Sequence, residues 1–189
     1  MDRYPSFSKL SAIEREGTDY SIEIMSRPNS EIILIAPHGG KIEFNTSEIT
    51  RKIAGTEFSF YCFNGLKISN NSHLHITSHL FDEPKGVEAV SDHKWAIAIH
   101  GFKNGDDNIP ILIGGKYKEM IKRFEESLES YGLKFRSSGH QFGGKERMNI
   151  CNRGSLGQGI QFELSRDFRE GKDIDIFISA IRNVLIKDR

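Results

Sequence analysis

Two histidines stand near the ends of short apolar runs, where a catalytic side chain could be held on a rigid strand. His38 ends the run at 31–38, and His100 lies close to the end of the run at 94–102. Both runs lack polar alternation, which is typical of parallel strands covered on both faces. Ligand sites in open α/β sheets lie beyond the carboxyl ends of the strands. We therefore predict that both imidazoles emerge at the same edge of a sheet.

A carboxylate follows the first of these histidines after a sharp turn. Gly39 and Gly40 come directly after His38, and without side chains they let the backbone reverse, so that Glu43 returns towards the histidine. Catalytic zinc in hydrolases is commonly held by two histidines and one carboxylate, with water in the open position. The sequence therefore predicts a Zn²⁺ site made of His38, Glu43 and His100.

Glu163 is the candidate general base that would take a proton from a metal-activated water. It lies in the run GIQFELS (159–165), whose apolar residues occupy alternate positions, so the glutamate faces the opposite side of the strand. An unpaired carboxylate on such a strand is costly, and it indicates a function or a partner. The structural alternative is a buried ion pair with Arg166 or Arg153.

Polar and cationic side chains near this strand could hold a substrate carboxylate. The planar guanidinium of arginine suits carboxylates, and the alternative is ordinary solvation at the surface. Asn152 with Arg153 is the preferred pair for this role. The remaining substrate-binding candidates are Arg147, Arg166, Lys41 and His75.

The other histidines fall into two groups. His73, His75 and His79 cluster in one turn-rich segment, which would suit either a second metal site or the lining of an active site. We favour lining, with His75 as the foremost candidate. His93 and His140 lie in polar stretches and are predicted to be solvated.

Strands interleaved with helices predict an α/β fold with a mainly parallel or mixed sheet, in one domain that spans 1–189. Further strands are expected at 57–65 and 109–115. Apolar residues with helical spacing predict helices at 117–131 and 174–185. A third helix is predicted at 46–55, because the hydroxyl of Thr46 or Ser47 can cap it and Gly55 can end it, and a short one is expected at 11–16.

Composition restricts the partners of the chain. Lysine plus arginine and aspartate plus glutamate both number 26, so no global charge favours nucleic acid or an anionic membrane. Cys62 and Cys151 have no metal-binding spacing and are expected to be free thiols. The N-terminal residues lack the apolar run of a signal peptide, and we expect synthesis in a cytoplasm and a monomeric protein with neither a nucleic-acid nor a membrane partner.

The combined motifs resemble the poly-γ-glutamate hydrolase family of bacilli and their bacteriophages. They are IAPHGGKIEFNTSEITRKIA, YCFNG, LHITSHLFDEP, WAIAIHGF, ILIGG, NICNRG and GIQFELSR, in this order from Ile32 to Arg166. The resemblance implies a zinc-carboxypeptidase-like α/β/α fold and endo-type cleavage of γ-glutamyl amide bonds in the anionic polymer. It also implies that a phage-encoded protein would be released by lysis of the host.

The resemblance carries functional residues onto particular positions. The family's PHGG-x-IE motif falls on His38 and Glu43, its strand-end histidine on His100, and its QxELS glutamate on Glu163. Lys41 departs from the family, which commonly has a third glycine there, and its cation could contact an anionic substrate or crowd the site.

Two other functions remain open. The same residues would serve a zinc-dependent deacetylase or another zinc amidase or carboxypeptidase, and activity on N-acetyl sugars or short peptides would distinguish these. A polymer-binding module that has lost catalysis is the alternative from another class, and a turnover assay would decide it.

Overall fold

A seven-stranded mixed sheet forms the centre of the protein. The computed structural model describes residues 2–104 and 108–187. The four central strands are parallel to one another, whereas β1 and β5 run antiparallel to their neighbours β3 and β7. In spatial order the strands are β1 (Tyr20–Met25), β3 (Ser59–Gly65), β2 (Ile32–Gly40), β4 (Trp95–Phe102), β7 (Ile160–Ser165), β5 (Ile111–Gly115) and β6 (Phe135–Arg136).

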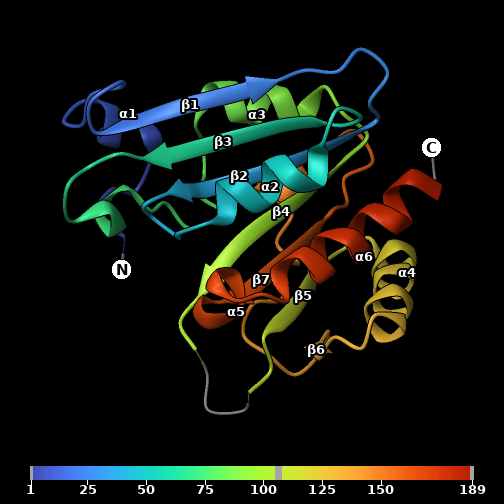
Figure 1. The fold of residues 1–189 in the computed structure, drawn as a ribbon. Coiled ribbons are helices and arrows are strands. Elements are labelled where there is room, and N and C mark those ends of the chain that lie inside the picture. Colours follow the sequence, from blue (N-terminus) through green and yellow to red (C-terminus); the bar gives the residue numbers. More distant parts are fainter. Residues whose placement is uncertain (1, 105–107, 188–189) are drawn as a thin grey trace.

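Two layers of helices and loops cover this sheet, one on each face (Figure 1). On one face pack α2 (Thr46–Ala54), α4 (Lys118–Ser130), α5 (Arg166–Glu170) and α6 (Ile174–Lys187). On the other face pack α1 (Phe7–Ser11) and α3 (Pro84–Ser91), together with the 3-10 turns η1 (Asn71–Leu74) and η2 (Ile150–Asn152). The predicted three-layer α/β/α fold with a mainly parallel mixed sheet is confirmed.

Burial explains why the central strands lack polar alternation. Along β2, Leu34 and Ala36 pack against the α2 and α6 layer, while Ile33 and Ile35 pack against the opposite layer. All four side chains are at most 1% exposed. A strand covered on both faces must be apolar at every position, because either face would otherwise bury an unsatisfied polar group.

The structure corrects the predicted elements at the N-terminus and adds others. The first helix is Phe7–Ser11 rather than 11–16, and the Ser6 hydroxyl accepts a hydrogen bond from the Lys9 amide at its start. The prediction missed α3, which begins at Pro84 and is capped by the Glu83 carboxylate. It also missed β1, although its residues alternate as expected of an edge strand, and the two-residue β6.

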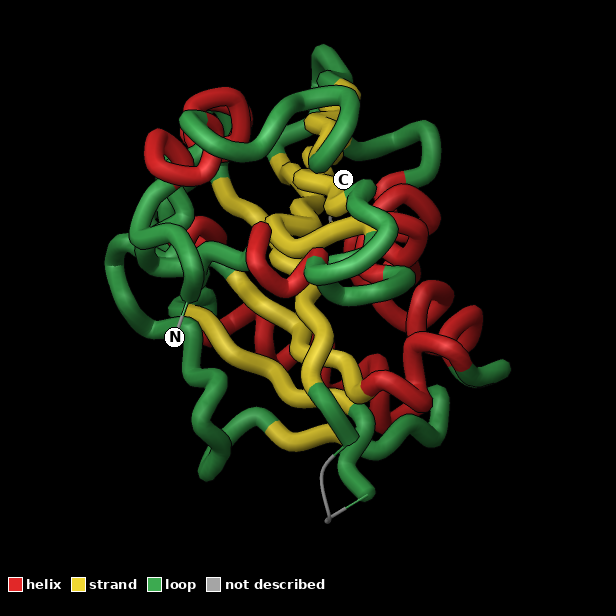
Figure 2. Tube along the Cα trace, turned by 90° about the vertical axis from the view of Figure 1, so that its left-hand side faces the viewer, coloured by secondary structure: helices red, strands yellow, loops and turns green. Residues whose placement is uncertain are grey.

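The carboxyl ends of β2, β3 and β4 point to one side of the molecule (Figure 1). Figure 2 shows the molecule from this side, with the strands in the middle and most of the helical turns to the right. Loops from the N-terminal segment and from the segments after each strand gather over these ends. This arrangement brings residues that are far apart in sequence to one edge of the sheet.

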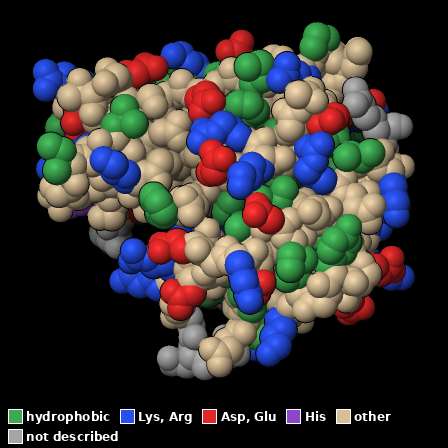
Figure 3. Space-filling view, viewed as in Figure 1, with side chains coloured by type: hydrophobic (Ala, Val, Ile, Leu, Met, Phe, Trp, Pro, Cys, Tyr) green, Lys and Arg blue, Asp and Glu red, His purple; other side chains and the backbone are tan. Residues whose placement is uncertain are grey.

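Charged side chains are mixed on the face shown in Figure 3, where lysine and arginine lie among aspartate and glutamate. Across residues 2–104 and 108–187, none of the helices has both the length and the apolar character that a membrane span requires.

Candidate metal centre and active site

The side chains of His38, Glu43 and His100 meet at the carboxyl end of the sheet. The Nδ1 atom of His38 lies 3.1 Å from Nδ1 of His100 and 3.2 Å from Oε1 of Glu43. The Nδ1 atom of His100 lies 3.7 Å from Oε2 of Glu43. Both histidines are only 2% exposed. The structure thus places the three predicted ligands within reach of one ion.

A bulge and a tight turn at the end of β2 create this meeting. The pairing of β2 with β3 shifts register between Ala36 and Gly39, and such bulges re-aim side chains next to active sites. The Glu43 amide then donates a hydrogen bond to the His38 carbonyl at 2.9 Å, which closes the turn and returns the carboxylate to the histidine.

Thr46 and Ser47 stabilise this turn and do not cap α2 as predicted. The N-cap is Asn45, whose side chain makes no capping bond. The Thr46 hydroxyl lies within hydrogen-bonding distance of the carbonyls of Glu43, at 2.7 Å, and His38, at 3.3 Å. The prediction of a capping hydroxyl was wrong because the turn before the helix contains closer acceptors.

The two glycines of the turn are required by space and by backbone conformation. A Cβ atom on Gly39 would lie 2.0 Å from Oγ of Ser47 and 2.8 Å from Oδ1 of Asn64. Gly40 has a φ of +62°, a conformation that residues with a side chain rarely adopt. A Cβ atom on Gly40 would also meet the backbone of Gly65. The pair therefore lets the loop pack closely against the end of β3.

Hydrogen bonds outside the cluster orient both imidazoles. Nε2 of His38 lies 2.8 Å from the Ile76 carbonyl, which can only accept, so this nitrogen is assigned the proton; in the neutral imidazole that binds a metal, Nδ1 then presents the lone pair. Nε2 of His100 lies 3.3 Å from the Ser78 hydroxyl. Metal-binding histidines commonly use their second nitrogen in this way.

The donor set fits a divalent cation such as Zn²⁺. A tetrahedral site with metal–donor distances of about 2.1 Å needs donor atoms about 3.4 Å apart, close to the separations within the cluster. The Gly101 amide donates to Oε2 of Glu43 at 2.8 Å and holds the carboxylate in place. Burial raises the pKa of Glu43, but the imidazoles of His38 and His100 outweigh burial and keep this pKa well below its usual value.

His75 adjoins the cluster. One donor atom from each of His38, Glu43 and His75 can be chosen so that all lie within 4.8 Å of one another. However, the His75 ring lies 3.9 Å from the His38 ring at an angle of 30°, so the in-plane lone pairs of the two rings run side by side rather than converge. This geometry favours His100 over His75 as the third donor, so that His75 lies beside the candidate metal site.

Asp2 holds His75 in its orientation. Oδ1 of Asp2 lies 2.8 Å from Nδ1 of His75, and Oδ2 accepts a hydrogen bond from the Thr77 amide at 2.6 Å. Burial and the neighbouring His38 lower the pKa of His75 to about 4, against the opposing effect of Asp2. Because Asp2 holds the Nδ1 side of the ring, Nε2 of His75 faces Glu43 and lies 3.9 Å from its Oε1 atom.

Glu163 lies beside His100, because these two residues are paired in the parallel ladder of β4 and β7. Its side chain is 6% exposed, and Oε1 accepts a hydrogen bond from Nε2 of Gln161 at 3.2 Å. Burial and the charge of Glu43 raise the pKa of Glu163 well above its usual value. A carboxyl group of this kind at a cleft is typical of a functional site.

The structural alternative for Glu163, an ion pair with Arg166 or Arg153, is wrong. Arg166 pairs with Glu170 at 3.0 Å. Arg153 donates to the carbonyls of Met148 and His79.

The cluster opens into a cleft of about 580 Å³ that is lined by the three predicted ligands, His75 and Glu163. A second hollow of about 520 Å³ lies against it and shares five of its lining residues. The shared residues are Glu43, His75, Gly101, Phe102 and Lys103. The two hollows therefore meet at the cluster.

The structure separates the substrate-binding candidates. Lys41 and Arg166 line the second hollow, and His75 lines both hollows. Arg147 is exposed, and neither Arg147 nor Arg153 lines one of these hollows.

Asn152, a further candidate, is bonded to the backbone. Its amide nitrogen donates to the carbonyls of Gly144 and Glu146, and its oxygen accepts from the Gly159 amide. These bonds hold the loop before β7 in place, so the structure gives Asn152 a packing role.

Sequence reasoning overlooked Asp2 and Arg169. Asp2 lies in an irregular N-terminal segment, and Arg169 lies in a short helix, so neither shows a pattern that would point to the site. His93 was predicted to be solvated but is 8% exposed, with Nδ1 lying 2.6 Å from the Ala89 carbonyl. This contact allows the imidazole to be buried among apolar residues.

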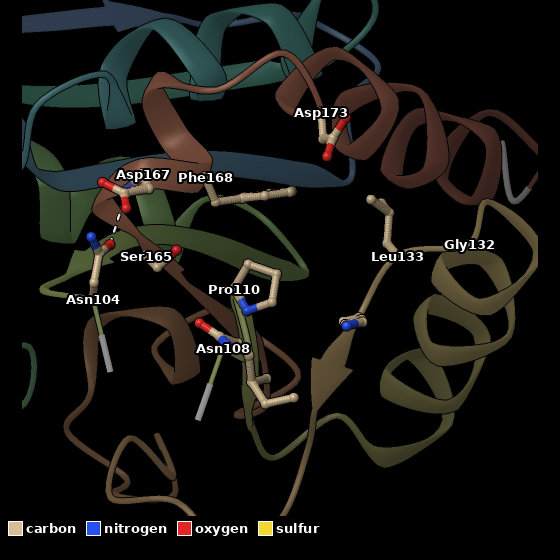
Figure 4. Close-up of a pocket in the computed structure, with 11 residues that line it drawn as sticks. Asn104, Asn108, Pro110, Gly132, Leu133, Ser165, Asp167, Phe168 and Asp173 are labelled. Atoms are coloured by element: carbon tan, nitrogen blue, oxygen red, sulfur yellow. Dashed lines mark hydrogen bonds between the residues drawn. The ribbon is translucent and has the colours of Figure 1, made fainter. Parts of the chain in front are cut away.

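A separate hollow of about 430 Å³ lies between the ends of β5 and β7 and the helix layer (Figure 4). Asn104, Pro110, Leu133 and Phe168 are among its lining residues, and the Asn104 side chain accepts a hydrogen bond from the Asp167 amide. Its described lining contains no histidine or cysteine. Its described lining therefore lacks the imidazoles that the cluster offers to a metal ion.

An α/β/α fold with two strand-end histidines, a carboxylate between them and a buried glutamate beside them defines the class of metal-dependent hydrolases. Comparison with known proteins gives the family within this class. A sequence profile described as poly-gamma-glutamate hydrolase matches residues 4–176. The chain belongs to the poly-γ-glutamate hydrolase family.

Relatives from Bacillus subtilis (strain 168) agree with this assignment. The UPF0714 protein YmaC is 34% identical and is matched over 99% of this chain and 85% of its own length. The SPbeta prophage-derived UPF0714 protein YoqZ is also 34% identical, over 96% of this chain, but only 65% of its own length is covered.

Solved structures show the same fold. A bacteriophage poly-gamma-glutamate hydrolase has a TM-score of 0.91 at 31% identity, with 100% of this chain and 98% of that chain covered. A zinc-free YndL structure also has a TM-score of 0.91, at 29% identity, with 100% and 99% covered. An N-formylglutamate amidohydrolase from Ralstonia eutropha, at 7% identity and a TM-score of 0.56, shares the fold alone, with 90% and 97% covered.

Proposed function

We propose that this protein is a zinc-dependent hydrolase that cleaves the γ-glutamyl amide bonds of poly-γ-glutamate. The observation that carries the proposal is the meeting of His38, Glu43 and His100 beside Glu163 in one cleft. Family membership and the similarity to a bacteriophage poly-gamma-glutamate hydrolase support the substrate.

His38, Glu43 and His100 would hold the zinc through Nδ1, a carboxylate oxygen and Nδ1, respectively. Their outer contacts with Ile76, Gly101 and Ser78 orient these donors before any metal arrives, which reduces the cost of ordering the site. When bound, zinc supplies a Lewis acid that polarises the amide carbonyl and lowers the pKa of water to about 7.

Glu163 accepts the proton of the attacking water at its carboxylate and returns it to the nitrogen of the departing amine. The same group thus acts as base and then as acid: the water oxygen bonds to the carbonyl carbon, and the bond from this carbon to the amide nitrogen breaks as the nitrogen receives the proton. A cation among His38, Glu43 and His100 would offset the charge of Glu43, which is one of the two causes that raise the pKa of Glu163. This favours the ionised carboxylate that the base needs.

The second hollow would hold the carboxylates of glutamate units on one side of the cleaved bond. Lys41, Lys103, Arg166 and Arg169 line it, whereas the lining of the first cleft has mainly uncharged polar groups beyond the cluster. This local group of cations would attract an anionic polymer, although the chain as a whole has no net charge. A substrate passing through both hollows would be cut within the chain, as endo-type cleavage requires.

Metal analysis of the purified protein, combined with the viscosity of a poly-γ-glutamate solution, tests this function. We expect close to one zinc per chain, a fast fall in viscosity, loss of this activity with a chelator, and recovery when zinc is returned. Short peptides and N-acetyl sugars serve as alternative substrates. Turnover of those substrates without a fall in viscosity would contradict the assignment, and so would full activity in a metal-free protein.

Substitution of the cations should weaken binding rather than chemistry. We expect the double variant Lys41→Ala with Arg166→Ala to raise KM for poly-γ-glutamate with little change in kcat, and to reduce the dependence of KM on salt. Two lost contacts of roughly 1 kcal/mol each would raise KM by about thirtyfold in total. Lys122→Ala with Lys118→Ala, on the surface of α4, is the matched control. An equal rise in KM for the control pair would argue against a cationic subsite in the second hollow.

The other expectations remain predictions. They are a monomeric state, no nucleic-acid or membrane partner, synthesis in a cytoplasm, and release by host lysis if a phage encodes the protein. Arg147, Arg153 and Asn152 also remain predictions as substrate-binding residues, although the structure supports Lys41, Arg166 and His75 more strongly.

A further inference from the structure

Arg169 is a buried arginine that sequence reasoning did not select. It lies near the end of the short helix α5, and its side chain is only 6% exposed. A buried guanidinium is costly unless its donors are used, so its contacts indicate what it does in the fold.

The Arg169 side chain connects three segments of the site. Its Nε atom donates to the Leu164 carbonyl at 3.1 Å, and Nη1 donates to the Phe44 carbonyl. The guanidinium also lies over Gly101, where an added Cβ atom would be 2.5 Å from Cζ. At the backbone, the Arg169 carbonyl accepts a hydrogen bond from Nδ2 of Asn45 at 3.0 Å.

Each residue that the Arg169 side chain contacts directly follows a residue of the proposed catalytic machinery. Phe44 follows Glu43, Gly101 follows His100, and Leu164 follows Glu163. One rigid, planar group therefore touches the backbone next to two proposed ligands and the proposed base. A lysine has a single nitrogen and could not maintain these contacts together.

We propose that Arg169 is a positioning residue, which holds the loop after β2 and the ends of β4 and β7 in the arrangement that brings Glu43, His100 and Glu163 together. This inference rests on the proposed function for the identity of the metal and the reaction. It also places a cation close to two carboxylates, since Glu43 and Glu163 both interact electrostatically with Arg169.

The test compares Arg169→Lys with Arg182→Lys. Arg182 is a matched control because it also joins segments, donating to the Ile53 carbonyl at 2.7 Å and to Glu57 at 2.8 Å, and it too lies against a glycine, Gly55. Arg182 is on the helix layer, away from the cleft. Both variants keep the positive charge and lose the planar fork.

We expect Arg169→Lys to weaken zinc binding by about tenfold to a hundredfold, as measured by competition with a chelator. We also expect kcat at saturating zinc to fall more than KM rises. Both variants should lower Tm by a similar amount, because each loses a planar group that joins segments. Arg182→Lys, however, should leave the zinc Kd and the kcat of the folded protein unchanged. Equal zinc Kd and kcat in Arg169→Lys and wild type would overturn the inference.

A readout in metal-free protein separates this inference from the proposed function. The imidazole NMR signals of His38 and His100 should shift in Arg169→Lys and stay in place in Arg182→Lys, and unchanged signals in both would contradict a positioning role. If wild type binds no zinc, the proposed function fails, while the NMR comparison still tests Arg169. Should Arg169→Lys fail to fold, Asn45→Gly removes the side-chain bond to Arg169 and should produce a smaller shift in the same signals.

Discussion

Glu163→Gln is expected to lower kcat by about a hundredfold to ten-thousandfold, the usual contribution of a general base. The amide cannot accept the proton of the attacking water, yet it has nearly the shape of the carboxyl group and can still contact Gln161. Zinc content should remain close to that of wild type, because the proposed ligands are His38, Glu43 and His100. Steady-state kinetics on poly-γ-glutamate and metal analysis of the same preparation measure both quantities.

Glu83→Gln is the matched control for a buried carboxylate. Glu83 is 1% exposed and accepts hydrogen bonds from the Tyr61 hydroxyl and the Gly86 amide, away from the cleft. We expect this variant to lose stability while the kcat of the folded protein is maintained. If Glu163→Gln also lost its zinc, Glu163 would be a ligand and the assignment of roles would have to be revised.

His38→Ala and His100→Ala are expected to lose the metal and with it most activity. Removal of one of three protein ligands leaves two donors, and the Lewis-acid contribution of several kcal/mol is lost, which corresponds to about a thousandfold or more in rate. Metal analysis after dialysis and kinetics with added zinc measure the two effects. Circular dichroism and Tm show whether each variant keeps the fold.

His93→Gln provides the histidine control. His93 is also buried, but its contact is with the Ala89 carbonyl, on the helix α3, rather than with the cluster. We expect this variant to retain zinc and kcat, with some loss of Tm. Retention of full zinc content by both His38→Ala and His100→Ala would refute the proposed ligand set and would direct attention to His75.

The sequence by itself determined the core of the fold and the types of residue at the site. Short apolar runs without alternation, bounded by glycine, proline or charged residues, indicated strands covered on both faces. Helical spacing of apolar residues predicted α4 and α6, and a capping hydroxyl with a terminal glycine predicted α2. Because parallel strands share one edge for their carboxyl ends, His38 and His100 could be placed together without coordinates. The resemblance to a family added the expected metal and substrate.

Only the tertiary structure decided which side chains complete the site. The pairing of His100 with Glu163 depends on the register of β4 against β7, which no local pattern specifies. Asp2 contacts His75 across 73 positions of sequence, and Arg169 reaches Phe44 across 125. Such contacts arise when the chain packs its loops over the sheet, and residues in irregular segments or short helices show no periodicity that could predict them.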